Sequence, residues 1–501
     1  MPIIDFQALH VHLRTTLRTS VAVALLATAG CERAVETPPA APALPLNELV
    51  VVVRPGPATY FNGPDGKPAG LDVDLLRLFA TLRKTPVRFI ATANSGDLAE
   101  IVAQGKAHVG AGGLYRPPTT PSSAARHLIS SITASDARER PVLWTSGYFI
   151  VAPVLIYNAD GFKPTGWRDL AGERVAYLTS TGLDADLAKL RQAYPAVQWA
   201  PTDAPSGDAL IAQVSDGRLD YAIVASNLAA VSRNVYLSFD VAFPIGGRRE
   251  LGWVLPPGAT GLRDEIDRFF LKIRRDGTLQ RLVDRYFGHP QQVLRMDAGI
   301  LQERIKSTLP QFRTAFEHAQ QMTGIEWRLL AALAYQESQW DPLATSETGV
   351  RGMMQLTEET ARHLGVLDRL DPKLSIAAAA RYLRTLKDKL PARIAEPDRT
   401  WLALAAFNIG LGHLEDARIL AQKQKLNPDS WSDVKKALPL LAEPEYYEQA
   451  KLGYARGGMP VAFVDRVRAY YDVLLAQQPG YQPRLQVAMP RDQERLFAAS
   501  P

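Results

Sequence analysis

The chain has 501 residues, of which 47% are hydrophobic and 22% are charged, a globular composition with room for about two or three domains. Its net charge of +5 arises from 57 basic and 52 acidic residues. That excess is too small to indicate nucleic-acid binding, and no basic run interleaved with aromatic residues is present.

The N-terminal segment predicts export. Arg14 and Arg18 precede an apolar run over 21–29, VAVALLATA. This run is too short to span a bilayer as a helix, which needs about 20 residues. Residues 1–31 are therefore expected to be a signal peptide and not a transmembrane helix.

Cys31, the single cysteine of the chain, directly follows Gly30 and resembles a lipobox cysteine, although Thr28 stands where leucine is commonest. Lipidation of Cys31 would anchor the protein to a membrane, and ordinary cleavage with an inert or removed Cys31 is the alternative. If Cys31 is acylated, Glu32 at the next position favours, by analogy with lipoproteins, sorting to the periplasmic face of the outer membrane over retention in the inner membrane. A soluble periplasmic protein is the alternative without the lipid. The proline-bearing residues 32–47 are expected to form an extended tether.

Residues 48–288 alternate short strand-like runs with amphipathic stretches, which predicts an α/β domain with mainly parallel strands. Ligands in such folds bind beyond the strand ends. The expected strands lie at Leu49–Arg54, Val87–Ala91, Val175–Leu178 and Tyr221–Val224, and a helix is expected at Leu71–Leu82.

Three phrases of this domain resemble the amino-acid-type periplasmic solute-binding family. They are GLDVDLLRLFA from Gly70, SDGRLDYAIVASN from Ser215, and the helical segment that closes at His289. The resemblance implies a bilobal periplasmic-binding-protein-like domain. Its crossover strands would lie near residues 150–156 and 245–255.

In that family an arginine binds the ligand carboxylate and an aspartate binds the ligand amine. Arg140 is the position we match to the arginine, with Arg116 and Arg138 as alternatives, and the aspartate position is occupied by Ala225. An ammonium group buried without a carboxylate partner is costly, so ordinary amino acids should bind poorly. A differently charged ligand and a purely structural spacer remain open.

No cofactor and no metal site are expected from the sequence. His108 and His127 are single histidines without metal-ligand partners nearby in sequence, and we interpret them as structural or surface groups.

After a linker at 289–300, residues 301–480 are expected to be mainly helical. Glu337 lies seven residues after Leu330 and four after Leu333, which places it on the apolar stripe of a helix that must end before Pro342. Desolvation and the negative helix end both raise the pKa of such a carboxyl group. This suits a general acid, and a plain surface glutamate is the alternative.

Two further segments support this interpretation of Glu337. A turn-rich stretch from Asp341 leads into Gly352 and the run Met353–Leu356, and an apolar helix over Trp401–Gly412 closes near Asn408. The chain therefore folds back after the helix that carries Glu337, with flexible glycines and an amide side chain.

The pairs and triplets in these segments resemble successive motifs of the soluble lytic transglycosylase catalytic domain, which has a goose-type lysozyme-like, mainly α fold. The motifs are Glu337-Ser338, Gly352–Gln355 and Ala406–Asn408. Their order and spacing agree over roughly residues 301–480, which makes the combination more specific than any one motif. The order of parts, lipobox, solute-binding-like domain and transglycosylase domain, is similar to that of membrane-bound members of this enzyme class.

The resemblance implies cleavage of peptidoglycan without water. Glu337 would protonate the oxygen between N-acetylmuramic acid and N-acetylglucosamine and then deprotonate the sugar 6-hydroxyl, which closes a 1,6-anhydro ring. Gln355 and Asn408 match positions that bind the sugar and its acetamido groups, and Ser338 would orient the acid. Met354, Phe407 and Phe463 would complete the substrate site.

The chain departs from the family pattern at Phe407 and Phe463, where tyrosines are usual, and at Met459, where glutamate is usual. A hydroxyl lost at Phe463 could come from a neighbouring tyrosine: Tyr446, Tyr447 or Tyr454.

Two rival functions remain open. A water-using muramidase would need a second carboxylate, with Asp341, Glu347 and Glu358 as candidates. A non-catalytic cell-wall-binding or solute-receptor protein would explain the departures as lost activity. The expected partners are peptidoglycan strands, the membrane and a small ligand or muropeptide of the first domain, and residues 481–501 are expected to be a tail.

Overall fold

The computed structural model describes residues 47–481, except for 58, 64–65, 93–96, 118–141, 180, 203, 234, 288–294 and 347–348. Several sequence predictions concern positions outside the described residues: the signal peptide, Cys31, most of the tether, His127, Arg138, Arg140, Glu347 and the tail.

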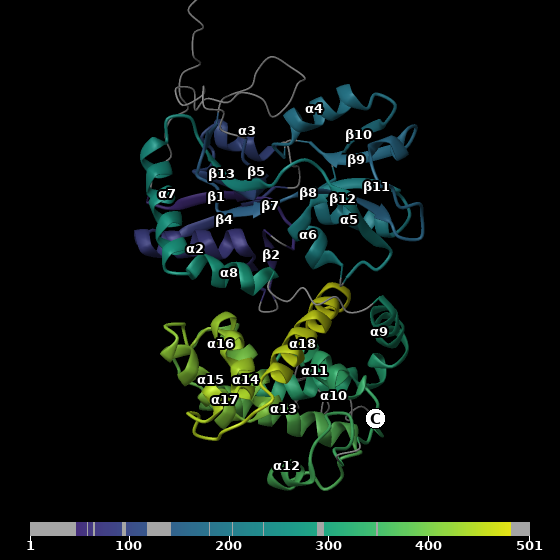
Figure 1. Cartoon of the computed structure of the whole chain (residues 1–501), viewed down its shortest axis with the longest axis vertical. Helices are drawn as coiled ribbons and strands as arrows, with labels where there is room; N and C mark the ends of the chain where they lie inside the picture. The colour runs from purple at the N-terminus through teal and green to yellow at the C-terminus, as the bar shows by residue number, and fades with distance from the viewer. Residues whose placement is uncertain are drawn as a thin grey trace, which may run out of the picture. The chain divides into compact units, whose positions relative to one another are not determined.

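The first part of the chain contains two mixed β-sheets (Figure 1). One has the order β4-β1-β5-β13-β6, with β7 paired to β13. The run LVVVV of β1 is fully buried, as expected for β-branched residues in a central strand that pairs in parallel with β4 and β5. The strands are β1 (Leu49–Val53), β4 (Val87–Ala91), β5 (Val109–Tyr115), β6 (Leu143–Trp144), β7 (Phe149–Val151) and β13 (Arg249–Leu255).

The second sheet has the order β10-β9-β11-β8-β12. Its strands are β8 (Pro153–Asn158), β9 (Arg174–Leu178), β10 (Gln198–Thr202), β11 (Tyr221–Ala225) and β12 (Phe239–Pro244). The chain passes from the first sheet to the second between β7 and β8 and returns between β12 and β13, which confirms the two predicted crossovers. As expected, most strands of each sheet run in the same direction. The exceptions are β8 and β13, which follow these crossovers and run antiparallel to their neighbours.

Helices cover these sheets. The predicted helix after Gly70 is α2 (Leu71–Arg83), and its apolar stripe packs with α7 (Thr260–Arg275) and α8 (Thr278–Phe287) in the main core of this domain. The shorter helices are α3 (Asp97–Ala103), η2 (Trp167–Leu170), α4 (Asp184–Ala193), α5 (Gly207–Ser215) and α6 (Ser226–Ser232). A small hairpin joins β2 (Phe61–Asn62) and β3 (Pro68–Ala69).

The second part is helical and has its own core. Its long helices are α9 (Arg295–Ser307), α10 (Leu309–Thr323), α11 (Trp327–Ser338), α13 (Pro372–Lys389), α14 (Asp398–Ile409), α15 (Leu411–Lys423) and α18 (Gly458–Gln477). The short ones are α12 (Glu358–His363), α16 (Trp431–Ala437), η3 (Leu438–Ala442) and α17 (Pro444–Tyr447). Helix α11 packs against α10, α13 and α18.

Across the described part of the chain, no helix combines the length and apolarity that crossing a membrane requires.

Candidate active site

Helix α11 carries the predicted acid at its end. The Glu326 side chain caps its start by accepting hydrogen bonds from the backbone N–H groups of Arg328 (3.0 Å) and Leu329 (3.2 Å). Every residue from Trp327 to Tyr335 is buried, and the helix ends where Gln339 adopts a left-handed conformation with φ 53°. Glu337 therefore lies in the final turn, as the sequence predicts.

The Glu337 carboxyl group lies between solvent and the buried body of α11. Its side chain has intermediate exposure, and within the described residues it has no hydrogen-bond or ion-pair partner. Burial is the cause that raises its pKa, to about 8. A carboxyl group with this pKa holds its proton at neutral pH and can give it to a substrate oxygen.

Ser338 connects the end of α11 to the turn that contains the two methionines. Its hydroxyl donates to the Met353 carbonyl oxygen at 2.8 Å and lies 3.3 Å from the Ala334 carbonyl oxygen. Ser338 thus holds the residue before it, Glu337, at a fixed place relative to that turn.

The turn itself requires a glycine at 352. Gly352 has φ 80°, and an added Cβ would lie 1.8 Å from the Arg369 carbonyl oxygen. Arg369 in turn donates from Nη1 to the carbonyl oxygens of Gly349 (3.0 Å) and Leu356 (3.1 Å). Sequence reasoning missed Arg369, since a single arginine in a polar segment has no distinguishing pattern.

Gln355 also braces this turn. Its Nε2 donates to the carbonyl oxygens of Gly352 (2.9 Å) and Ala344 (3.1 Å), and its backbone has φ 46°. The neighbouring Met354 is fully buried in the helical core, and its N–H faces the Ser375 hydroxyl at 3.3 Å. Met354 therefore lies beneath the turn, and Gln355 keeps only its amide oxygen clear of these two internal hydrogen bonds.

Helix α14 presents the third motif. Asn408 is exposed near its end, and the helix stops at Gly410, which has φ 90°. The preceding Phe407 is half-buried, with its ring 5.5 Å from the ring of Tyr382 on α13.

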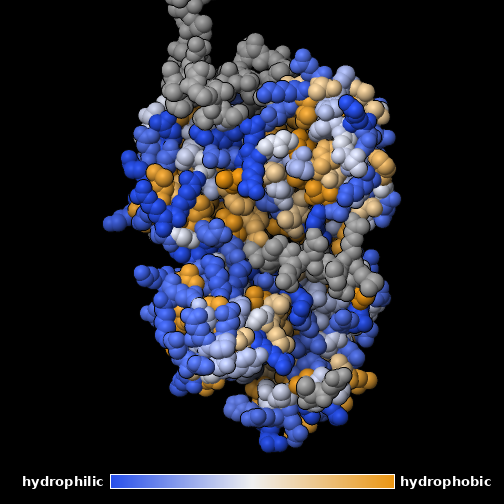
Figure 2. Space-filling model, viewed as in Figure 1, coloured by the Kyte–Doolittle hydropathy of each residue, from blue (hydrophilic) through white to orange (hydrophobic). Residues whose placement is uncertain are grey.

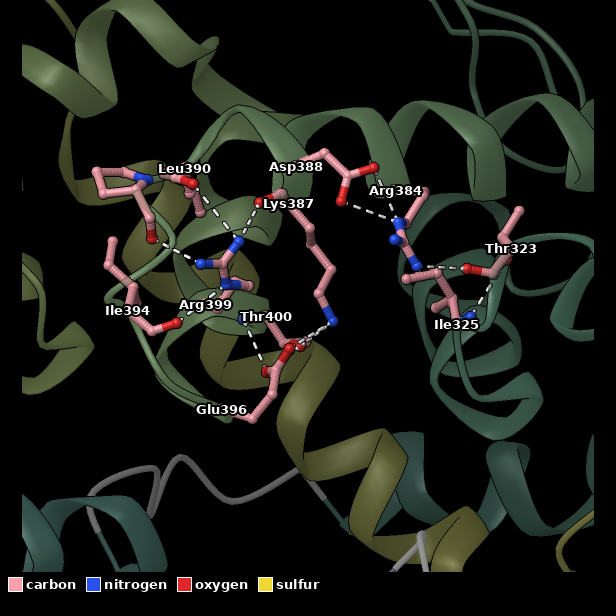
Figure 3. Close-up of polar contacts among 11 residues, drawn as sticks. Thr323, Ile325, Arg384, Lys387, Asp388, Leu390, Ile394, Glu396, Arg399 and Thr400 are labelled. Carbon is pink, nitrogen blue, oxygen red and sulfur yellow. Dashed lines mark hydrogen bonds and ion pairs between the residues drawn. The ribbon is translucent and has the colours of Figure 1, made fainter.

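A polar network fixes the other end of α14 (Figure 3). The Arg399 guanidinium donates to the carbonyl oxygens of Lys387 (2.8 Å), Ile394 (3.0 Å), Pro391 (2.6 Å) and Leu390 (3.4 Å). Lys387 pairs with Glu396 at 2.7 Å, and Glu396 accepts from the Thr400 hydroxyl at 2.7 Å. These contacts join the end of α13 to the start of α14, and Glu396-Pro397 between them is a cis peptide bond.

The other two departures from the family pattern, Met459 and Phe463, lie on α18. Phe463 is buried and Met459 is exposed. Tyr454 is exposed, and its ring meets that of Tyr447 edge to face at 5.8 Å. Within the described residues, none of Tyr446, Tyr447 and Tyr454 donates a hydrogen bond to Glu337.

Two of the three candidate second carboxylates have other partners. Asp341 accepts from the Leu343 N–H at 2.9 Å and so stabilises the turn after α11. Glu358 pairs with Arg362 at 3.2 Å, and both side chains are about three-quarters exposed. Neither carboxylate is buried in the way that Glu337 is.

In the first domain, the structure describes one of the three candidate arginines. Arg116 pairs with Glu250 at 3.2 Å and is not among the residues that line the cavity between the two sheets. Ala225 does line this cavity, and so does Arg54, which sequence reasoning missed. His108 is buried and accepts a hydrogen bond from the Val50 N–H at 2.9 Å, which agrees with a structural role.

Comparison with known proteins finds one family in each of the two domains. Residues 314–429 match the family described as "Transglycosylase SLT domain", and residues 118–289 match "Bacterial extracellular solute-binding proteins, family 3". The chain is 41% identical over 440 residues to "Membrane-bound lytic murein transglycosylase F" of Methylobacillus flagellatus, a match that covers 87% of this chain and 89% of the relative. The protein of the same name from Thiobacillus denitrificans is 40% identical over 470 residues, covering 93% and 95%.

Solved structures also match part of the chain. A putative L-cystine ABC transporter protein from Listeria monocytogenes has 19% sequence identity and a TM-score of 0.41, and the match covers 48% of this chain and 96% of that chain. An arginine-binding protein mutant from T. maritima has 20% identity and a TM-score of 0.40, covering 48% and 96%.

Proposed function

The chain belongs to the membrane-bound lytic murein transglycosylase F family, a family of peptidoglycan lytic transglycosylases with an N-terminal solute-binding-like domain, and from this premise we propose that Glu337 is its catalytic acid and base. The protein is thus a carbon-oxygen lyase that acts on a polysaccharide. The observation that carries the assignment of Glu337 is its place in the last turn of α11, where burial raises its pKa to about 8.

The proposed reaction needs one carboxyl group. Glu337 gives its proton to the glycosidic oxygen as the bond from that oxygen to C1 of N-acetylmuramic acid breaks. The 6-hydroxyl oxygen of the same sugar then bonds to C1, and its proton returns to the Glu337 carboxylate. The product carries a 1,6-anhydro ring, no water is consumed, and the enzyme regains its starting protonation state.

The remaining candidate residues have supporting roles in this proposal. The exposed Asn408 amide would donate or accept hydrogen bonds with the sugar and its acetamido groups, and the Gln355 amide oxygen would accept them. Ser338 would position Glu337 through its bond to the Met353 carbonyl oxygen. Phe407 would contact the substrate, whereas buried Met354 and Phe463 would support the site from below.

Product mass separates this reaction from its rivals. Purified protein is incubated with peptidoglycan sacculi, and the soluble muropeptides are analysed by mass spectrometry. Anhydro products, one water lighter than hydrolysed ends, are expected. Hydrolysed ends would indicate a water-using muramidase, and glycan binding without any soluble product would indicate a non-catalytic wall-binding protein.

We also propose how the parts are used. Acylation of Cys31 would hold the protein at the periplasmic face of the outer membrane, with residues 32–47 as a tether, 48–288 as a ligand-sensing domain, 289–300 as a linker, and 301–480 as the catalytic domain. Cys31→Ala should release the protein from the outer-membrane fraction into the soluble periplasmic fraction. Retention of this variant in the membrane would contradict the lipid anchor. From sequence matching, Arg140 is one candidate for a ligand-binding arginine of the first domain.

A further inference from the structure

A cavity lies between the two sheets of the first domain, at the carboxyl ends of β1 and β11. One wall is formed by Arg54, Gly112 and Tyr115, and the opposite wall by Tyr177, Ser206 and Ala225. The cavity between them has a volume of about 90 Å³, so its occupant must be small.

The first wall is positively charged. Arg54 follows β1 directly, is 5% exposed, and donates from Nη1 to the Gly112 carbonyl oxygen at 3.3 Å. Burial lowers its pKa to about 10, against the opposing effect of Tyr115 and Asp72, so its guanidinium stays charged at neutral pH. Asp72 does not line the cavity: it accepts from the Trp253 indole N–H at 2.8 Å, and burial raises its pKa to about 6.

A second donor lies beside the guanidinium. The Tyr115 side chain is 4% exposed, and its hydroxyl has no hydrogen-bond partner within the described residues. Burial raises the pKa of this phenol, so it keeps its proton and remains a donor. A buried hydroxyl without a partner destabilises the protein, and a bound acceptor would remove this penalty.

The cavity has few groups that could pair with an ammonium group of a ligand. Within the described residues, Asp208 is the one carboxylate that lines it. Its two oxygens accept from the Ser232 hydroxyl (2.9 Å) and the Tyr236 hydroxyl (3.0 Å), so both are already engaged by donors of the protein. The charge balance of the cavity therefore favours an anion.

The remaining surface is apolar. Leu71, Tyr148, Leu183, Ile223 and Leu251 line the cavity. Hydrophobic surface is also visible in the middle of the first domain, in the region between its two sheets (Figure 2). A ligand that fills this space should carry an apolar body.

We propose that this cavity binds a small carboxylate that has an apolar body and lacks an ammonium group, with Arg54 and Tyr115 as its anion-binding pair. This inference rests on the ligand-sensing role given above to the first domain and names its ligand class. Arg54 supplies the charge, and the Tyr115 hydroxyl donates to the same carboxylate.

Matched pairs of 2-oxo acids and amino acids test the proposal directly. Phenylpyruvate is compared with L-phenylalanine, and 4-methyl-2-oxopentanoate with L-leucine, by calorimetric titration of the full chain in detergent. Each pair has the same apolar body and carboxylate and differs only in the oxo or ammonium group. We expect at least one oxo acid to bind ten-fold or more tightly than its amino acid.

Variants identify the cavity as the site. Arg54→Gln should weaken oxo-acid binding at least ten-fold, and Tyr115→Phe should weaken it several-fold. Arg116→Gln is the matched control, because Arg116 pairs with Glu250 outside the cavity lining, and it should leave binding unchanged. Ala225→Asp adds a carboxylate to the opposite wall and should reverse the preference within each pair, which keeps the test informative if Arg54→Gln fails to fold.

Equal or tighter binding of the amino acids, or no binding of any of the four probes, would overturn the proposal. Unchanged oxo-acid affinity in folded Arg54→Gln and Tyr115→Phe would do the same. Muropeptide release from sacculi is measured on the same preparations. A wild-type preparation that binds an oxo acid but releases no muropeptide would contradict the catalytic assignment and leave the ligand class untouched.

Discussion

The Ser338 hydroxyl donates to the Met353 carbonyl oxygen at 2.8 Å, across fifteen positions of sequence. This bond joins the last residue of α11 to the first methionine of the turn that Gly352 begins. Because Glu337 precedes Ser338, the proposed acid is held against the turn by its neighbour and keeps its own carboxyl group out of internal hydrogen bonds.

Replacement of the proposed acid should abolish turnover. Glu337→Gln keeps the side-chain shape but cannot exchange a proton, so muropeptide release should fall by about 10²–10⁴-fold, the usual contribution of a general acid. Glycan binding should persist in a sedimentation assay with sacculi. Glu358→Gln, at an exposed glutamate paired with Arg362, is the control and should keep its activity. A Glu337→Gln enzyme that retains most of its turnover would show that the acid is another residue.

The rate of the enzyme should fall as the pH rises on the alkaline side. The protonated carboxyl is the active acid, and its pKa is about 8, so kcat/KM should fall as the pH rises through about 8. The measurement is the release of soluble muropeptide from sacculi at a series of pH values. A rate that stays level from pH 7 to pH 10 would contradict a buried acid.

The same pKa has a consequence for stability. The folded protein holds the Glu337 proton up to about pH 8, whereas the unfolded chain releases it near the ordinary value of 4.5. The contribution of this group to the free energy of unfolding is therefore complete below about pH 4.5 and is lost as the pH rises through about 8. Glu337→Gln should be relatively more stable than the wild type at pH 9 than at pH 4 in urea unfolding. An equal difference at both pH values would argue against the raised pKa.

Substitution of Gly352 should destabilise the protein, because there is no room for a side chain at this position. In Gly352→Ala the new Cβ would lie 1.8 Å from the Arg369 carbonyl oxygen, on a backbone with φ 80°. Gly349→Ala is the matched control, since Gly349 has φ 81° but nothing within 4 Å of an added Cβ. We expect Gly352→Ala to lose about 1–3 kcal/mol more free energy of unfolding than the control, together with most of the lytic activity. Equal losses would mean that the turn moves freely away from Arg369.

The two arginines of Figure 3, Arg399 and Arg384, should contribute unequally to the free energy of unfolding. Arg399, at the start of α14, donates hydrogen bonds to four backbone carbonyl groups at the end of α13 and in the segment that follows it. Arg399→Met removes this donor and should cost about 2–3 kcal/mol of unfolding free energy. Arg384→Met breaks a half-exposed pair with Asp388 and a 3.2 Å bond to the Thr323 carbonyl oxygen, and should cost about 1 kcal/mol or less. Chemical unfolding of both variants measures the difference, and a cost at Arg384 as large as that at Arg399 would contradict it.

Local pattern was sufficient for several features of this protein. The β-branched run at β1 predicted a buried strand, and the apolar stripe that includes Leu330 and Leu333, closed before Pro342, placed Glu337 in a last helical turn. These predictions succeeded because burial of a strand or of a helix face depends on residues close together in sequence. The family motifs added the reaction class.

Tertiary structure alone decided the rest. Arg54 lies in a cavity wall opposite Ala225, and Arg369 lies over Gly352, although no sequence pattern distinguishes either arginine. The antiparallel direction of β8 and β13 likewise depends on where the chain crosses between two sheets. Each of these relationships joins residues distant in sequence, and their meeting is set by how helices and sheets pack and not by the local periodicity of either segment.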